Sequence, residues 1–193
     1  MTGVFRLLLA VLLSSGLSIA QNPPTSSPPV TSAGTKNPSD AKAADPKDVD
    51  SVDHIIAALY DVISGPQGKQ RDWERMRTLF FSGAHLIPTG KRPTGEMTVR
   101  MLGVDDYIER SKPFFEKEGF FETEIARRTE NFGHVTHAWS TYTSRHAPSE
   151  APFARGINSI QLVNDGKRWW VLNIFWEAEH DDNKLPEKYL KGQ

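Results

Sequence analysis

Residues 154–176 read ARGINSIQLVNDGKRWWVLNIFW and contain the clearest structural signal in the chain. Two runs rich in β-branched and aromatic residues flank the pair Asp165-Gly166. An Asp-Gly pair in this setting is typical of a tight β-hairpin, because both residues tolerate the positive φ angles that the turn needs. The stretch therefore predicts two antiparallel strands, over residues 154–164 and 168–179.

The chain before this hairpin changes its hydrophobic period from 3.6 to two near Gly119. Pro113 is expected to end or kink the last of the helices. The elements predicted are helices over 52–63, 71–81 and 104–117, short strands over 84–88 and 97–102, and long strands over 120–131 and 134–146. Helices followed by a run of antiparallel strands predict an α+β fold in which the helices cover one face of a curved sheet.

The first fifty residues differ in composition from the rest. Residues 1–20 carry Arg6, an apolar run and small residues up to Ala20, which is the layout of a secretory signal peptide. An uncleaved anchor is the alternative, but the run is shorter than the roughly 20 residues that span a bilayer. Residues 21–50 are rich in Pro, Ser and Thr and lack aromatic residues, which predicts a disordered linker.

We therefore expect an exported protein, periplasmic or extracellular, that is cut after Ala20. One folded domain, residues 51–193, follows the linker, and no later segment is long and apolar enough to span a membrane. The 193-residue chain has no cysteine, which excludes disulfides, thiolate metal sites and a cysteine nucleophile. The net charge of −1 argues against a nucleic-acid partner, and the six scattered histidines predict no metal. No nucleotide-binding motif occurs, so we expect no cofactor.

The hairpin sequence and four further stretches resemble the NTF2-like (SnoaL-like, nuclear transport factor 2) superfamily, in particular its exported bacterial members of uncharacterised function. The further stretches are LYDVISGP at 59–66, LIPTG at 86–90, DDYI at 105–108 and STY at 140–142. The resemblance covers about residues 52–179. It implies a cone in which three helices pack on a strongly curved, mainly antiparallel sheet, a cavity at its wide end, and a homodimer formed through the sheet. Because this fold hosts many activities, the resemblance implies a fold more than a function.

Alternation along the long strands assigns residues to the two faces of the sheet. The more apolar set is expected on the concave face, and its polar members are Arg127, His137, Thr141 and Asn158. The opposite set, which includes Glu122, Glu124 and Ser140, is expected on a solvated outer face. A β-bulge would reverse the assignment beyond it.

The enzymes of the superfamily use a general acid or base and a hydrogen-bond donor inside the cone, so the candidate catalytic residue is His137. A buried structural histidine is the alternative for this residue. Arg127 is a candidate anion ligand or a surface charge neutralised by Glu124 and Glu130, and the tryptophans are candidate core or ligand-contacting residues. The candidate ligand-binding residues are Tyr60, His85, Tyr107, Arg127, Trp139, Asn158, Trp170 and Trp176.

Three functional hypotheses follow. The first is an exported binding protein that holds a small apolar or amphipathic molecule in the cone. The second is a cofactor-independent enzyme of the isomerase, dehydratase or cyclase type, with His137 as the base. The third is a dimerisation or protein-interaction domain whose cone is filled by aromatic side chains.

Overall fold

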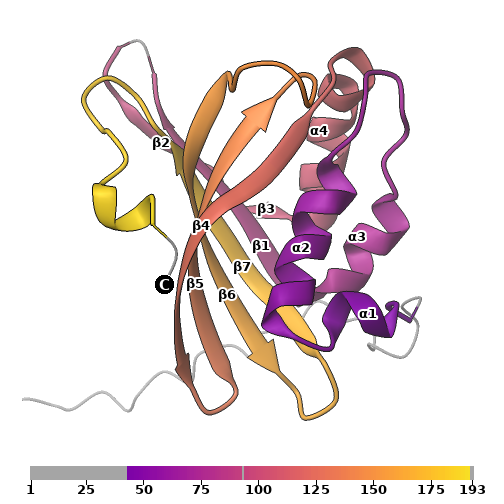
Figure 1. The fold of residues 1–193 in the computed structure, drawn as a ribbon. Coiled ribbons are helices and arrows are strands. Elements are labelled where there is room, and N and C mark those ends of the chain that lie inside the picture. Colours follow the sequence, from indigo (N-terminus) through magenta and orange to yellow (C-terminus); the bar gives the residue numbers. More distant parts are fainter. Residues whose placement is uncertain (1–42, 93, 192–193) are drawn as a thin grey trace, which may run out of the picture. The chain divides into compact units, whose positions relative to one another are not determined.

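The computed structural model describes residues 43–92 and 94–191, which form a curved sheet with helices against one face (Figure 1). The signal peptide and most of the linker expected from the sequence lie outside the described residues. The helices are α1 (Pro46–Val49), α2 (Val52–Ile63), α3 (Trp73–Leu79), α4 (Val104–Lys117) and the short 3-10 helix η2 (Glu187–Tyr189). The strands are β1 (Phe80–Lys91), β2 (Met97–Val99), β3 (Leu102–Gly103), β4 (Phe121–Phe132), β5 (Val135–Arg145), β6 (Ala154–Asn164) and β7 (Trp169–Ala178).

Helices α2 and α4 have the bounds that the hydrophobic period predicts. In α2, the Ser51 side chain accepts a hydrogen bond from the His54 amide and caps the first turn. Helix α4 continues through Pro113 to Lys117, so the expectation that proline ends this helix is wrong. Helix α3 is shorter than the predicted 71–81, because Phe80 and Phe81 already begin strand β1.

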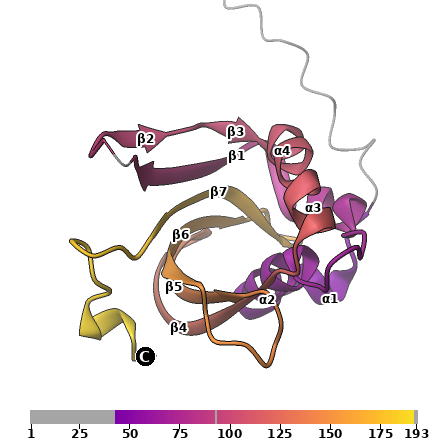
Figure 2. The same ribbon diagram turned by 90° about the horizontal axis from the view of Figure 1, so that it is seen from above.

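The strands form one sheet in the order β2-β1-β7-β6-β5-β4, with β3 paired to β1. Only the β1–β7 pair is parallel among the described strands, so the sheet is mainly antiparallel as expected. Seen from above, strands β4 to β7 curve around the side on which α2 lies (Figure 2). The predicted α+β class, with helices covering one face of a curved sheet, is confirmed.

Three register shifts interrupt the sheet, and two of them lie among strands β4 to β7. One lies in β4 between Glu124 and Ala126, and the other lies where Gln161 and Leu162 of β6 pair with Asn173 and Val171 of β7. An extra residue in one strand bends it and exchanges the faces of all residues beyond it. These two sites therefore decide which side chains face the helices.

The folded part begins before Ser51, where the linker was expected to end. Val49 of α1 is 4% exposed and belongs to the hydrophobic core. Asp48 accepts two hydrogen bonds from the Arg75 guanidinium on α3, at 2.7 and 2.9 Å, and these bonds hold the pKa of Asp48 below its usual range. The last residues of the expected linker are thus part of the domain.

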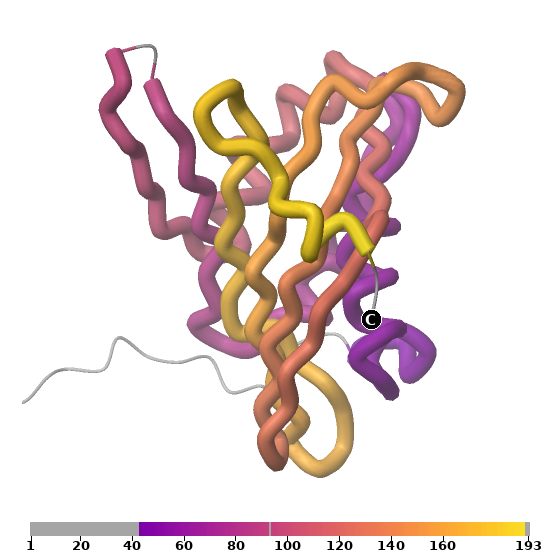
Figure 3. Tube along the Cα trace, turned by 60° about the vertical axis from the view of Figure 1, so that its left-hand side comes forward, coloured from indigo at the N-terminus to yellow at the C-terminus, as the bar shows by residue number. Residues whose placement is uncertain are grey.

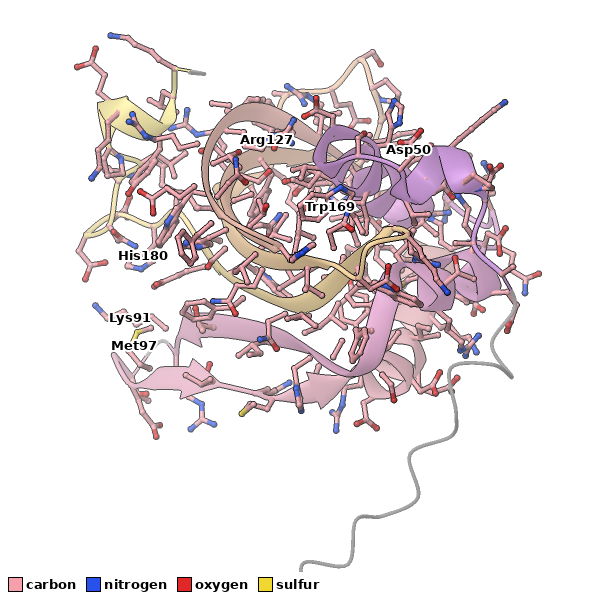
Figure 4. The ribbon with its side chains drawn as sticks, turned by 90° about the horizontal axis from the view of Figure 1, so that it is seen from below. Asp50, Lys91, Met97, Arg127, Trp169 and His180 are labelled. Carbon is pink, nitrogen blue, oxygen red and sulfur yellow. The ribbon has the colours of Figure 1, made fainter. Side chains whose placement is uncertain are left out.

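The outer face of the sheet, away from the helices, carries the C-terminal segment, residues 180–190. This segment runs across the outer face of the sheet (Figure 3). The Tyr189 ring stacks on Trp139 of β5, with 5.6 Å between the ring centroids. Its other end lies near the tip of the β1–β2 hairpin, where Lys91 and His180 both pair with Asp182 (Figure 4). None of the described helices is long and apolar enough to cross a membrane.

Candidate functional site

The candidate site is a cavity of about 120 Å³ between the helices and the inner face of the sheet. Most of its wall is apolar or aromatic and comes from helices α2 and α3, the loop before β4 and strands β1, β6 and β7. These wall residues are Leu59, Ile63, Met76, Phe80, Leu86, Phe120, Ile160, Ile174 and Trp176. Four polar side chains complete the lining, namely Tyr60, Tyr107, Glu122 and Asn158. A mostly apolar cavity with a few convergent polar groups is the usual form of a small-molecule site.

Glu122 is the carboxylic acid of the cavity wall. The Ser144 hydroxyl of β5 donates to Glu122 Oε2 at 2.8 Å. Desolvation raises the pKa of Glu122 to about 7, although the hydrogen bonds from Ser144 and Asn158 favour its ionised form. The carboxyl can therefore gain or release a proton near neutral pH.

Asn158 and Tyr60 lie next to Glu122 and are joined to each other. The amide nitrogen of Asn158 donates to Tyr60 Oη at 3.1 Å, and Tyr60 Oη lies 2.6 Å from Ser140 Oγ on β5. Burial raises the pKa of Tyr60, so its hydroxyl keeps its proton at physiological pH. Both side chains are 8% exposed, and their positions are fixed by these bonds.

Tyr107 approaches the cavity from helix α4. Its ring packs edge-on against Trp176, with 6.2 Å between the ring centroids. Burial also raises the pKa of Tyr107, which makes its hydroxyl a neutral group within the apolar wall. Tyr107 and Trp176 thus provide an aromatic side to the cavity, at the end where β7 leaves the sheet.

Four of the candidate ligand-binding residues line this cavity: Tyr60, Tyr107, Asn158 and Trp176. Arg127 does face the helices, but it pairs with Asp53 of α2 at 2.8 Å and lies outside the cavity lining. Figure 4 shows Arg127 beside α2. It also pairs with Glu124, so of the two carboxylates named in the alternative for this residue, Glu124 and Glu130, only Glu124 forms an ion pair with it.

The remaining candidates lie outside the cavity. His85 alternates with the cavity residue Leu86 along β1 and so faces the other way. Trp139 stacks on Tyr189 on the outer face. Trp170 also lies outside the cavity, because the register shift between β6 and β7 turns its neighbour Val171 inward instead. The Trp170 indole donates to Asp165 at 2.8 Å and lies against the Arg168 guanidinium.

His137 does not face the cavity, so the expected placement of this residue on the concave face is wrong. Its Nε2 atom lies 2.9 Å from Ser159 Oγ, and its ring contacts Trp139 on the outer face. Ser140, Tyr142 and Ser144 of the same strand face the helices instead. The expected inward residue Thr141 also lies outside and donates to the Tyr189 carbonyl.

The error has a physical cause. Strand β5 places Trp139 outward, where Tyr189 of the C-terminal segment stacks on it. It places Ser140 inward, where the hydroxyl of Tyr60 on α2 bonds to it. Apolar character therefore fails to mark the inner face of this strand. If the two faces of β5 are exchanged, Ser144 lies on the inner face. Glu122 of β4 pairs with Ser144 and therefore lies on the inner face as well.

Comparison with solved structures finds similar folds at low sequence identity. A putative ketosteroid isomerase from Shewanella frigidimarina NCIMB 400 has 12% identity and a TM-score of 0.44, over 66% of this chain and 96% of that chain. NTF2-like proteins of unknown function from Shewanella baltica OS155 and Silicibacter pomeroyi DSS-3 both have a TM-score of 0.40. The Shewanella baltica protein is 13% identical, over 66% of this chain and 90% of that chain. The Silicibacter pomeroyi protein is 14% identical, over 67% of this chain and 99% of that chain.

No protein-family model and no curated protein matches this sequence. The described part of the chain has the α+β architecture that the sequence predicted, a curved and mainly antiparallel sheet with helices on one face.

Proposed function

We propose that this domain binds a small, neutral, mainly apolar molecule whose one polar group lies against Glu122 and Asn158. The observation that carries the proposal is the placement of one carboxyl and one amide in an otherwise apolar cavity. Apolar walls supply binding energy through desolvation, whereas the two polar groups select the orientation of the ligand. This is the amphipathic ligand that the sequence predicted, with Glu122 added to the site.

The size of the cavity limits the ligand. A cavity of about 150 Å³ lined by apolar residues accommodates benzene in other proteins. The cavity here measures about 120 Å³, slightly less than that, and it is not fully enclosed. It therefore suits a ligand close to benzene in size, with about six or seven non-hydrogen atoms. A carboxylate ligand would place its charge beside Glu122, so we expect neutral molecules to bind better than acids.

The test uses cyclohexanone as a probe of suitable size, titrated into the isotope-labelled protein and followed by NMR. Saturable shifts should appear at Leu59, Ile160 and Ile174. Asn158→Leu should weaken binding about fivefold, because it removes a hydrogen bond worth about 1 kcal/mol. Gln161→Leu, which changes an exposed residue of the same strand, is the matched control and should have no effect.

Two results would overturn the proposal: an absence of saturable shifts at these cavity residues with cyclohexanone, or equal affinity of the wild-type and Asn158→Leu proteins. Cyclobutanecarboxylate, which like cyclohexanone has seven non-hydrogen atoms, serves as the charge control. It should bind more weakly than cyclohexanone above the pKa of Glu122.

Proton transfer on the bound molecule is the second candidate function. It is favoured by one observation, the position of the Glu122 carboxyl in the cavity wall. Burial there raises its pKa to about 7, and a general base works best when its pKa lies near the operating pH. Glu122 replaces His137 as the proposed base. Wild-type protein should accelerate deuterium exchange at the carbons next to the carbonyl of cyclohexanone, and Glu122→Gln should abolish the acceleration. Equal exchange with both proteins would exclude this function.

The hypothesis of a filled cone has less support, because Trp139 and Trp170 lie outside the cavity. Export and self-association through the sheet stay predictions of the sequence. Sedimentation of a monomer at concentrations of tens of micromolar would contradict the homodimer.

A further inference from the structure

A second space, of about 260 Å³, lies on the outer face of the sheet beneath the C-terminal segment, which crosses that face (Figure 3). Its floor comes from the outward side of strands β5, β6 and β7, and its roof comes from residues 183–186 and Tyr189. We call this space the outer pocket. It is about twice as large as the ligand cavity, and among the described residues Trp176 alone lines both. The function proposed above makes no use of it.

The roof of the outer pocket is anchored on both sides of the floor. At one end Asp182 pairs with Lys91 at the tip of β1. At the other end the Thr141 hydroxyl of β5 donates to the Tyr189 carbonyl at 2.6 Å, and the Tyr189 ring stacks on Trp139. Two anchors on different strands hold the segment across the face, so the space beneath it is bounded by the fold.

The floor of the outer pocket places a small residue between two aromatic ones. Ser159 of β6 pairs with Trp139 of β5 on one side and with Phe175 of β7 on the other. Neighbouring strands lie about 4.8 Å apart, so the Trp139 and Phe175 backbones are separated by about 10 Å, and the short Ser159 side chain lies between them. The result is a hollow with aromatic sides, which fits a flat ring. Phe175 is 46% exposed, so covering its ring contributes hydrophobic binding energy.

The charged side chains of the outer pocket are already paired within the protein. The pairs are Glu177–His180, Glu179–Arg155 and Lys184–Asp181, with nitrogen–oxygen distances of 3.2, 2.7 and 3.3 Å. A charged ligand would lose its hydration there and would compete with an existing partner. The outer pocket therefore favours an uncharged ligand.

We propose that the outer pocket is a second ligand-binding site, which takes a flat, uncharged, mainly apolar molecule of about ten non-hydrogen atoms. Scaling from the cavity of about 150 Å³ that accommodates benzene gives this size for a space of 260 Å³. The C-terminal segment crosses the floor between its two anchors, so a sheet or helix of another protein cannot lie flat on these residues while the anchors hold. The site is separate from the function proposed above, since it lies on the opposite face of the sheet.

The test uses 2-naphthol, a flat fused-ring molecule of suitable size, titrated into the isotope-labelled protein and followed by NMR. Saturable shifts should appear at Ile157 and Leu185, which line the outer pocket, and not at Ile160, because 2-naphthol is too large for the ligand cavity. Phe175→Ala should weaken binding about fivefold, because it removes one aromatic contact. Phe132→Ala, which changes an exposed phenylalanine outside the pocket, is the matched control and should have no effect.

Two further measurements separate binding in the outer pocket from a general effect on the structure. Tyr189→Ala removes the ring of one anchor and part of the lining, so it should weaken binding of 2-naphthol and leave binding of cyclohexanone to the ligand cavity unchanged. Cinnamate has as many non-hydrogen atoms as 2-naphthol but carries a negative charge, and it should bind more weakly. Equal affinity for cinnamate and 2-naphthol would overturn the restriction to uncharged ligands.

Three results would overturn the site itself. They are the absence of a saturable shift at Ile157 with 2-naphthol, equal affinity of the wild-type and Phe175→Ala proteins, and shifts at Ile157 and Leu185 when the protein is concentrated without 2-naphthol. The last result would assign the outer pocket to a second copy of the chain. None of them bears on the ligand cavity, which is tested with cyclohexanone.

Discussion

The two halves of the inner sheet face differ in chemistry. Strands β4 and β5 present carboxyl and hydroxyl groups toward the helices, with Glu122, Ser140 and Ser144 hydrogen-bonded to neighbours. Strands β6 and β7 present Ile160, Ile174 and other apolar side chains, and Asn158 is the exception that lies next to the polar half. The cavity therefore lies on a boundary between a polar wall and an apolar wall.

This difference separates the two tasks of a binding site. The apolar half supplies desolvation and is insensitive to pH, whereas the polar half selects orientation and changes its charge near pH 7. Buried polar groups are tolerated there because each is hydrogen-bonded; among the described residues, every buried side-chain nitrogen or oxygen has a partner. Substitutions in the two halves should accordingly affect stability in different ways.

The largest effect is expected from the apolar half. Ile160 is 1% exposed, and Ile160→Ala should destabilise the domain by between about 2 and 5 kcal/mol in urea unfolding, with no dependence on pH. Ile157→Ala, at an outward position of the same strand, should cost less. A marked pH dependence of the Ile160 effect would contradict the division of the face into two halves.

Glu122→Gln should change stability in a way that depends on pH. Folding raises the pKa of this carboxyl from 4.5 to about 7, so its favourable contribution is complete below about pH 4.5 and is lost as the pH rises through 7. The Gln variant should therefore be more stable than wild type by about 3 kcal/mol above pH 7, and the difference should vanish in acid. Urea unfolding at a series of pH values measures this difference, with Glu130→Gln, an exposed change on the same strand, as the control. A flat profile for Glu122→Gln would exclude a buried, titrating carboxyl.

Ser144→Ala should raise the pKa of Glu122 further. The Ser144 hydroxyl donates to the Glu122 carboxylate, and a hydrogen bond to a charged group contributes about 2 kcal/mol. The titration midpoint of the Glu122 carboxyl carbon, measured by NMR, should rise by about 1.5 units. Ser159→Ala, which alters a hydroxyl bonded to His137 on the outer face, should leave the midpoint in place.

The smallest effect is expected outside the cavity. Tyr189→Ala removes the stack on Trp139 and should cost about 1 kcal/mol. Binding of cyclohexanone should stay unchanged, because neither ring lines the cavity. Weaker binding in this variant would show that the outer face influences the inner one.

The sequence was sufficient for most of the fold. Helices α2 and α4 and strand β6 have the predicted bounds, because helix period, caps and the Asp165-Gly166 turn are local signals. Tyr60, Tyr107, Asn158 and Trp176 were correctly expected near the cavity. These residues lie where the inner face is truly the more apolar one, or on the inward side of an amphipathic helix.

The sequence was insufficient where tertiary structure decides the face. Glu122 and His137 were assigned to the wrong sides because a distant segment, Glu187–Tyr189, covers the outer face of β5. Trp170 was misplaced by a register shift that leaves no mark in the alternation of β7. Both effects depend on contacts between residues far apart in the chain, which a pattern within one strand does not contain.

The parallel pairing of β1 with β7 has a consequence for the order of assembly. Residues 80–91 pair with the short strands β2 and β3 nearby, but their long partner is β7 at residues 169–178, so during synthesis this pairing must wait until residue 178 has left the ribosome. The meander from β4 to β7 needs only neighbouring segments and can pair first. The cavity, which takes walls from both β1 and β7, is then completed in the last step of folding, and a chain truncated before Trp169 would lack it.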